Sequence, residues 1–390
     1  MNSSPPTLMD NTKARKKRRR KKKLTRILAV LFFILGIMLI IFRHDLDYYS
    51  VRLKVMSLFN FGNELGQLSE VPIGFDISGD MAYGASKENL VLLSQLRLAV
   101  YRKDGTTSLN ETVSFGNPCV VSSGGRFLAF DRGGKDLLVC SSTSVIEKYI
   151  APQVIIDAHI NSKGFYAVAQ EGTQARAVVT LFNNYGAPVY VFSSAENYLS
   201  AVRVGDDGQM AVAGFDVADG MLTSSILLLD KKSEQPVLKI DLKDEFVVEL
   251  RLENSIITAI TDVRAVAFNA KTGEEVATFE NESRALVGSS VDSSNKTVLM
   301  FGRYAAGQGG TLVMLDSRLF TTGTVEVSRD VRYMASNAGK TAIVYDGGGA
   351  VYDEAGALVI ETLLSGVKAA VVTSSGRAIF AQADKITIHG

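Results

Sequence analysis

Few stretches of this 390-residue sequence have the residue types and spacing that chemistry requires. The stretch FDVADGML, residues 215–222, places two carboxylates, Asp216 and Asp219, in a short segment. Ca²⁺ binds oxygen ligands at alternating positions of a loop, and only two of the three needed here are present. The glycine-rich stretch GRYAAGQGGT, residues 302–311, would let a ligand approach backbone amides, although we favour a simple loop between two strands.

Familiar catalytic and metal-binding patterns do not occur. NAGKT, residues 337–341, resembles the end of a phosphate-binding loop, but Met334 stands where that loop needs a glycine, so we predict a hairpin turn. The histidines, His44, His159 and His389, form no His-x-His or His-Glu-x-x-His motif, and the sequence predicts no zinc site. No serine lies in a Gly-x-Ser-x-Gly elbow. The sequence therefore names no catalytic residue and no metal ligand.

The densest charge is KARKKRRRKKK, residues 13–23, which runs into LTRILAVLFFILGIMLIIF. Such a block is a nucleic-acid arm, a nuclear address or the cytoplasmic flank of a membrane anchor. Residues 27–42 are all apolar or glycine, which gives a helix of about 24 Å against a hydrocarbon core of about 30 Å. No small-x-small cleavage site follows. The sequence predicts one uncleaved transmembrane signal anchor at residues 27–42.

The charge distribution predicts which side of the membrane each part occupies. Residues 1–26 hold eleven basic residues and one acid, and this excess keeps them in the cytoplasm as a basic tail. Residues 43–70 then form a juxtamembrane connector, and residues 71–390 form an extracytoplasmic domain. Residues 27–390 hold 31 basic and 40 acidic residues, a balance that repels nucleic acid. The residues assigned to orientation are Lys16, Arg18, Arg19, Arg20, Lys21, Lys22, Lys23 and Arg26.

From about residue 71, short apolar runs such as RFLAF, ILLLD and TVLMF alternate with tight polar turns. These runs predict strands in hairpins, and the gaps between them are too short for crossover helices. The turns recur about every 41 residues, at Asn89, Gly125, Gly164, Gly208, Asn254, Asn295, Gly339 and Gly376. A second corner recurs in alternate repeats, at Gly105, Gly186, Gly273 and Gly356.

Four short strands in each repeat of about 41 residues predict an all-β fold, a single β-propeller. Eight corners predict eight blades, with seven as the alternative if one corner belongs to an insertion. The last repeat stops one strand short at Gly390. We predict that VPIGFDI, residues 71–77, supplies the missing outer strand and closes the ring.

One corner carries a family resemblance. AFNAKTGEEVATF, residues 267–279, resembles the repeat of pyrroloquinoline-quinone-type propellers, in which an Asp/Asn-x-x-Thr-Gly corner joins the two outer strands. With its anchor, the chain resembles bacterial membrane-anchored quinoprotein-like propellers of unknown function. The quinone enzymes of that group use a Trp and a vicinal cysteine pair, whereas this chain has no Trp and no adjacent cysteines. We therefore expect no cofactor.

The two cysteines test the predicted strand order. Cys119 and Cys140 lie in strands separated by RFLAF, so their Cα atoms should be about 10 Å apart. A disulfide needs Cα atoms within about 7 Å. We predict two free, buried thiols.

These features predict a membrane-anchored binding or scaffold module rather than an enzyme. Its partner would be a protein or a cell-wall component outside the cytoplasm, and the chain would span the cytoplasmic membrane once with its N-terminus inside. The alternative is a hydrolase or lyase of envelope polysaccharide that uses carboxylates at the propeller channel. The fold itself does not decide between them.

Overall fold

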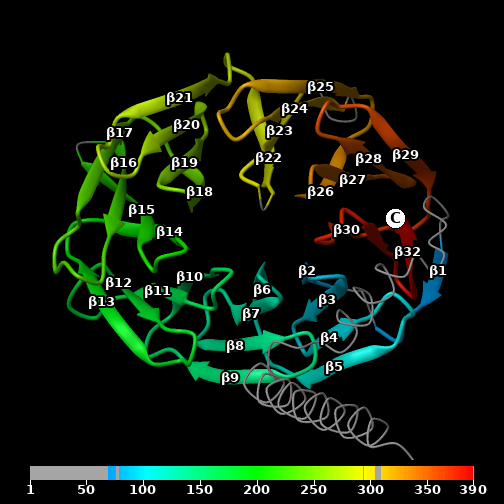
Figure 1. Ribbon diagram of the computed structural model, residues 1–390, viewed down its shortest axis with the longest axis horizontal. Coiled ribbons are helices and arrows are strands. Elements are labelled where there is room, and N and C mark those ends of the chain that lie inside the picture. The colour runs from blue at the N-terminus through cyan, green and yellow to red at the C-terminus, as the bar shows by residue number, and fades with distance from the viewer. Residues whose placement is uncertain (1–68, 76–78, 219, 293, 304–308, 390) are drawn as a thin grey trace, which may run out of the picture. The chain divides into compact units, whose positions relative to one another are not determined.

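The computed structural model describes residues 69–75, 79–218, 220–292, 294–303 and 309–389. The predicted tail, the predicted span at residues 27–42 and connector residues 43–68 lie outside these ranges. Residues Gly62–Gly390 form one compact unit, and its described part contains 32 β-strands in eight four-stranded antiparallel sheets (Figure 1). Within the described residues, no helix has the length and apolar character needed to cross a bilayer.

The sheets follow one another along the chain as blades 1 to 8. The strands of the first four blades are β2 (Met81–Ser86), β3 (Asn89–Ser94), β4 (Arg97–Tyr101), β5 (Thr107–Thr112); β6 (Pro118–Ser123), β7 (Arg126–Asp131), β8 (Asp136–Ser141), β9 (Val145–Ile150); β10 (Ile155–Ile160), β11 (Tyr166–Glu171), β12 (Ala177–Phe182), β13 (Pro188–Ser194); β14 (Tyr198–Val204), β15 (Met210–Ala218), β16 (Met221–Leu229) and β17 (Leu238–Lys243).

The remaining blades repeat the pattern, and the last one takes a strand from the start of the domain. Their strands are β18 (Val247–Glu253), β19 (Ile256–Thr261), β20 (Arg264–Asn269), β21 (Glu275–Glu280); β22 (Ala285–Val291), β23 (Thr297–Gly302), β24 (Gly310–Leu315), β25 (Thr321–Val327); β26 (Val331–Asn337), β27 (Lys340–Tyr345), β28 (Gly348–Asp353), β29 (Leu358–Leu363); β30 (Ala369–Val372), β31 (Ala378–Ala381), β32 (Lys385–His389) and β1 (Ser69–Pro72).

The fold is an eight-bladed β-propeller, which confirms the predicted fold class and blade number. The first strand of each blade lies at the centre of the ring, and β2 contacts β6 on one side and β30 on the other (Figure 1). All eight predicted turns fall between the first and second strands of successive blades. The second corner type falls between the third and fourth strands of blades 1, 3, 5 and 7, where Gly105 and its equivalents have positive φ.

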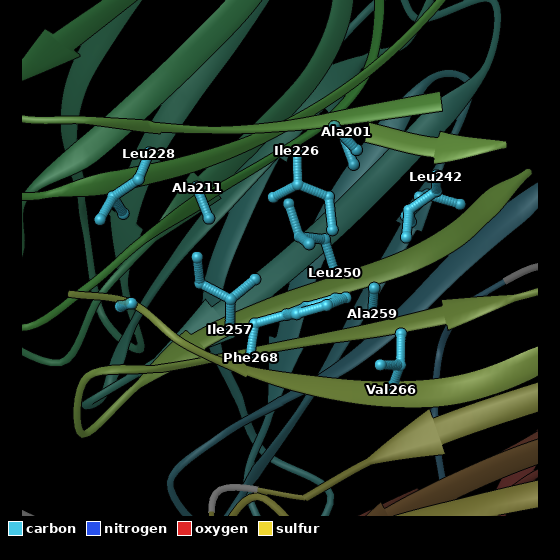
Figure 2. Packing of buried hydrophobic residues seen from close by; sticks show 13 residues of the cluster. Ala201, Ala211, Ile226, Leu228, Leu242, Leu250, Ile257, Ala259, Val266 and Phe268 are labelled. Atoms are coloured by element: carbon cyan, nitrogen blue, oxygen red, sulfur yellow. The ribbon is translucent and has the colours of Figure 1, made fainter. Parts of the chain in front are cut away.

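The core is divided into eight apolar clusters, one between each pair of neighbouring blades. Figure 2 shows the cluster between blades 4 and 5, where Phe268 and Ile257 meet Ile226 and Leu228. Fully burying a side chain of this size contributes about 1.5–3 kcal/mol. Because every middle strand is covered on both faces, strands such as β3 have a continuous apolar run, while an outer strand such as β21 alternates between partly buried and exposed side chains.

The ring closes where β1 pairs antiparallel with β32, with Ser69 opposite Ile388 and Pro72 opposite Lys385. The sequence correctly predicted that an N-terminal strand completes the last blade, but the predicted range of 71–77 was wrong. The strand ends at Pro72, and Ile73 and Phe75 turn inward to join the apolar cluster between blades 8 and 1. Burial of these two large apolar side chains adds to the stability of the closure.

Polar turn side chains join neighbouring blades. The Asn161 side-chain amide donates to the Gly205 carbonyl at 2.7 Å, from blade 3 to blade 4. The Asp292 carboxylate accepts from the Gly339 N–H at 3.3 Å, from blade 6 to blade 7. These hydrogen bonds are directional, so they add orientation to an interface that otherwise consists of apolar packing.

The cysteines confirm the predicted strand order in blade 2. Cys119 pairs with Phe130 and Cys140 pairs with Phe127, so β7 lies between the two cysteine-bearing strands. Both thiols are free. Cys140 is buried as predicted, but Cys119 is only partly buried, because it lies on the first strand at the channel rather than in the middle of the blade.

Burial raises the pKa of both thiols, most strongly for Cys140. Because the thiolate is the reactive form, we expect Cys140 to resist iodoacetamide in the native protein at about pH 8.5, the ordinary thiol pKa, and Cys119 to react slowly. Both should react rapidly in urea without added reductant, as measured by intact-mass spectrometry. A Cys119–Cys140 crosslinked peptide in the non-reduced protein would contradict the strand order.

Candidate interaction face

The strand order divides the loops between two faces of the propeller. Because the strands run alternately up and down, turns within the first and third hairpins of a blade lie on one face. The turns between second and third strands, and the connections between blades, lie on the other. We call this second face the connection face.

Blades 4, 5 and 6 present a group of exposed apolar side chains at strand ends on the connection face. Their exposed fractions lie between 43% and 62%, and we call this group the apolar sector; it consists of Tyr198, Val217, Met221, Val248, Val263 and Val287. Elsewhere on this face, among the described residues, Leu96, Ile150 and Leu363 are exposed singly, each in a different blade. Exposed apolar side chains gathered on one face make it a candidate interaction surface.

Aromatic contacts make the sector continuous from blade 4 to blade 5. Phe215 lies 5.8 Å from Tyr198 and 5.8 Å from Phe246, measured between ring centroids. The guanidinium of Arg176 lies over Tyr198, 4.9 Å from the ring centroid. The same Arg176 forms an ion pair with Asp216 at 2.5 Å.

This ion pair bears on the calcium hypothesis for residues 215–222. The hydrogen bond from Arg176 is the largest effect that lowers the pKa of Asp216, so its carboxylate is charged and already partnered. Asp219 lies outside the described residues. Within the described part of the chain, no group of three or more His, Cys, Asp or Glu side chains is arranged to hold a metal ion. The segment instead forms the end of the β15–β16 hairpin, whose nine-residue strands are longer than those of its neighbours.

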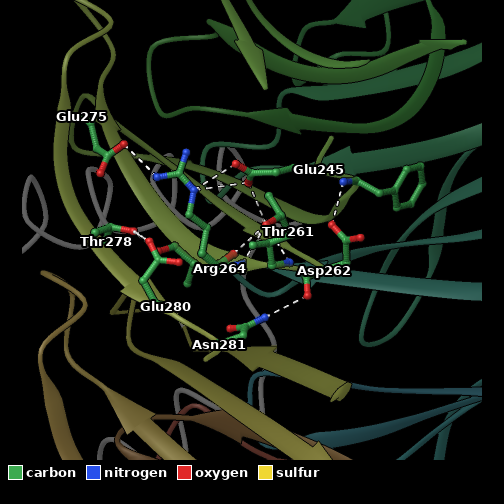
Figure 3. A network of polar contacts seen from close by, with 11 residues as sticks. Glu245, Thr261, Asp262, Arg264, Glu275, Thr278, Glu280 and Asn281 are labelled. Atoms are coloured by element: carbon green, nitrogen blue, oxygen red, sulfur yellow. Dashed lines mark hydrogen bonds and ion pairs between the residues drawn. The ribbon is translucent and has the colours of Figure 1, made fainter. Parts of the chain in front are cut away.

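A network of ion pairs borders the sector in blade 5 (Figure 3). The Arg264 guanidinium lies between Glu245, at 3.1 Å, and Glu275, at 3.0 Å. The Thr261 hydroxyl donates to Glu245 as well, at 3.0 Å. Asp262, the next residue in the chain, is outside this network: its carboxylate accepts from the Phe246 N–H at 2.8 Å.

A pocket of about 350 Å³ opens between blades 5 and 6 within the sector. Val248 and Val287 form its walls, Asp262 supplies a carboxylate, and the remaining lining residues are Ala285, Leu286 and Gly288. Both valines are bulged residues of the innermost strands, because the register shifts between Val247 and Glu249 in β18 and between Leu286 and Gly288 in β22. A bulge re-aims its side chain, which here turns the valines to the surface.

The channel wall contains carboxylates, as the polysaccharide-enzyme alternative requires, but each one has a partner. Asp157, with only 4% of its side chain exposed, binds Arg203 at 2.7 Å and Arg132 at 3.2 Å. Glu249 accepts from the Ser289 hydroxyl at 2.7 Å. Glu253 lies 3.7 Å from Arg251, and burial raises its pKa. The contacts of Asp157 link blades 2, 3 and 4, the bond between Glu249 and Ser289 links blades 5 and 6, and the Glu253–Arg251 pair lies within β18.

His159 is part of the same wall. Its Nδ1 accepts the Val204 N–H at 3.1 Å, which ties β10 to β14. Loss of hydration, with the charges of Arg203 and Arg251, holds the pKa of His159 well below its ordinary value. The imidazole is therefore neutral in the folded protein.

This lowered pKa predicts a loss of stability in mild acid. Below about pH 6.5 the unfolded chain binds a proton at this residue while the folded chain does not, so the free energy of unfolding falls by up to about 1.4 kcal/mol per pH unit. The loss levels off once the pH reaches the lowered pKa of the folded state. We expect His159→Asn to remove this component, measured as the difference in urea-unfolding free energy between about pH 7.5 and about pH 5.5.

His389→Asn is the matched control, since the pKa of His389 is also lowered by burial but it lies in blade 8. That variant should remove only the smaller component of His389 and keep that of His159, so its stability should fall more between these pH values than that of His159→Asn. Equal pH slopes for His159→Asn and the parent protein would show that this histidine does not titrate on unfolding.

The other stretches named in the sequence lie in turns or outside the described residues. NAGKT is the β26–β27 hairpin turn, as predicted, with positive φ at Ala338 and Gly339. Residues 302–311 join β23 to β24, and their central part, 304–308, lies outside the described residues. His44 and the basic residues assigned to membrane orientation also lie outside them.

Sequence reasoning did not identify the apolar sector. Val217 and Met221 flank the acidic turn of FDVADGML, and an exposed hairpin tip with apolar neighbours was a usable signal. Val248 and Val287 gave no such signal in the sequence, because a bulge cannot be recognised without the strand register.

The comparisons with known proteins bear on the fold. No protein of curated function matches this sequence. Among solved structures, the C-terminal WD40 domain of Sif2 is similar with a TM-score of 0.61 and 13% identity, over 84% of this chain and 99% of that one. Sqt1 of Saccharomyces cerevisiae is similar with a TM-score of 0.57 and 10% identity, over 82% and 98%. BamB from Moraxella catarrhalis is similar with a TM-score of 0.53 and 12% identity, over 83% and 99%.

At these identities the solved structures support the propeller fold alone. A sequence family covers the propeller itself, from residue 71 in β1 to residue 388 in β32. Through this match over residues 71–388, the chain belongs to the family of unknown function DUF5711.

Proposed function

We propose that this protein is a non-catalytic binding scaffold that is anchored in the cytoplasmic membrane. Its propeller lies outside the cytoplasm and binds a protein partner through the apolar sector. The observation that carries the proposal is the concentration of six exposed apolar side chains in three adjacent blades of one face. Exposed apolar area of this kind is costly in water and becomes favourable when a partner covers it.

The surroundings of the sector favour a protein over a small molecule. The exposed side chains extend over blades 4 to 6, and the aromatic contacts join them into a surface rather than a closed cavity. Protein interfaces combine an apolar centre with a polar rim, and the ion pairs of Arg176 and Arg264 supply such a rim here.

The location rests on the first 42 residues. The eleven basic residues before the apolar run 27–42 support an anchor with its N-terminus in the cytoplasm and the propeller on the opposite side. Protease added to protoplasts should digest the propeller and spare the N-terminal tail. Digestion of the tail alone would reverse the proposed orientation.

Partner binding is tested by placing a photoreactive amino acid at Met221 and, separately, at Val263 in living cells. Val189 is the matched control, because it is similarly exposed but lies at the start of the outer strand β13, beside a turn on the face opposite the connection face. We expect one and the same protein, identified by mass spectrometry, to crosslink at Met221 and Val263 but not at Val189. Identical adducts from all three positions, or no adduct from either sector position, would overturn the proposal.

A further inference from the structure

The pocket between blades 5 and 6 contains a carboxylate without a cationic partner. Asp262 is exposed, and among the described residues no Lys or Arg lies within ion-pair distance of it. The nearby Arg264 is held by Glu245 and Glu275 on the far side of the turn (Figure 3). One oxygen of Asp262 accepts the Phe246 N–H, which fixes the carboxylate at the pocket.

In blade 7, the aspartate at the position equivalent to Asp262 has a cationic partner from the same chain. In β26 the register shifts between Val331 and Tyr333, so Arg332 is the bulged residue, as Val248 is in β18. Val331 pairs with Tyr345, which precedes Asp346, just as Val247 pairs with Thr261, which precedes Asp262. In blade 7 the bulged Arg332 forms an ion pair with Asp346. Blade 5 therefore has valine where blade 7 has the arginine that neutralises its aspartate.

The charge around the pocket is one-sided. The five connection-face loops between Ser194 and Ala285 (195–197, 219–220, 244–246, 262–263 and 281–284) contain six acidic residues and one basic residue. The remaining loops of this face contain five acidic and six basic residues. Arg176 and Arg264 also lie beside the sector, but each forms an ion pair with a carboxylate. The excess of negative charge thus coincides with the apolar sector, and it attracts a cationic partner while repelling anionic lipids and polysaccharides.

We propose that this pocket binds an arginine side chain of the partner protein. The guanidinium pairs with Asp262, and its methylene groups pack between Val248 and Val287. Arginine fits better than lysine because its planar group offers paired donors to a carboxylate and loses hydration more easily. This inference rests on the proposed function, since it names the chemistry by which the apolar sector recognises its partner.

The test uses the full chain in a non-ionic detergent and a short fluorescent peptide with one arginine between valines. The same peptide with citrulline keeps the shape and removes the charge. Fluorescence anisotropy should show that the arginine peptide binds about two- to fivefold more tightly, the usual effect of an ion pair with an exposed carboxylate. Asp262→Asn should remove this difference. Asp346→Asn, the equivalent change in blade 7, should leave it intact.

A second variant tests the comparison with blade 7 directly. Val248→Arg supplies the missing guanidinium from the chain itself, so it should abolish peptide binding without lowering the unfolding temperature. Equal binding of the arginine and citrulline peptides, no measurable binding of the arginine peptide, or binding unaffected by Asp262→Asn would each overturn the arginine site. If crosslinking at Met221 and Val263 persists in Asp262→Asn while the peptides do not discriminate, the arginine site fails and the partner-binding face stands.

Discussion

A chain that lacks residues 69–75 is expected to lose at least about 5 kcal/mol of its free energy of unfolding, because large-to-small changes at two buried side chains cost this much before any ladder bond is counted. The deletion removes β1, leaves β32 as an open edge, and takes Ile73 and Phe75 out of the cluster between blades 8 and 1. It also removes the hydrogen bond from the Ile73 N–H to the Asp384 carbonyl, 2.9 Å long. Urea unfolding of the full and shortened chains measures the difference.

Single substitutions separate the apolar contribution from the strand pairing. Phe75 is 4% exposed and lies edge-on to Tyr101 at 6.4 Å, so Phe75→Ala alone should cost about 3–5 kcal/mol. Phe320→Ala, at a phenylalanine that is 66% exposed, is the matched control and should change stability little. Equal stability of the parent protein and the deletion would show that the ring does not need this closure.

A second expected result concerns Glu88, which lies in the β2–β3 turn and also joins the two ends of the ring, on the face opposite the connection face. Its carboxylate accepts four hydrogen bonds from the β30–β31 turn: from the Ser374 hydroxyl at 2.8 Å, the Ser375 N–H at 2.9 Å, the Ser375 hydroxyl at 2.6 Å and the Thr373 hydroxyl at 3.1 Å. Arg377 lies 3.5 Å away. These contacts join blade 1 to blade 8 across 285 residues of sequence.

We expect Glu88→Gln to lower the free energy of unfolding by about 2–3 kcal/mol, because an amide turns one acceptor into a donor that faces other donors. The urea-unfolding midpoint measures this loss. Glu282→Gln, at a side chain that is 77% exposed on the other face, should have no comparable effect. The idea fails if the two variants unfold at the same urea concentration.

The two closures show what could be predicted from one sequence. The need for an N-terminal strand followed from a last repeat with only three strands, and β1 confirms it. The range of that strand did not follow, because nothing local distinguishes a residue that continues a ladder from one that turns into the core, as Ile73 does. Glu88 gave no signal at all. Its partners TSSGR lie at the other end of the chain and look like any polar turn.

The candidate site divides in the same way. Asp216 and Asp219 attracted attention as neighbouring carboxylates, but Asp216 is neutralised by Arg176 from the preceding blade. Cys119 and Cys140 were placed correctly because their separation depends only on the order of adjacent strands. Asp262 was not noticed, because its importance lies in a comparison with Asp346 that the strand register alone reveals.

The sequence by itself determined the strands, the turns, their repeat and the blade number, because short apolar runs and turn residues that adopt positive φ act over a few neighbouring residues. Only the tertiary structure decided which charges are neutralised. Arg332 meets Asp346, Arg203 meets Asp157, and Asp262 meets valine instead. These outcomes depend on bulges and on the seating of one blade against the next. Each of these contacts joins residues whose spacing in the sequence does not predict that they meet in the fold.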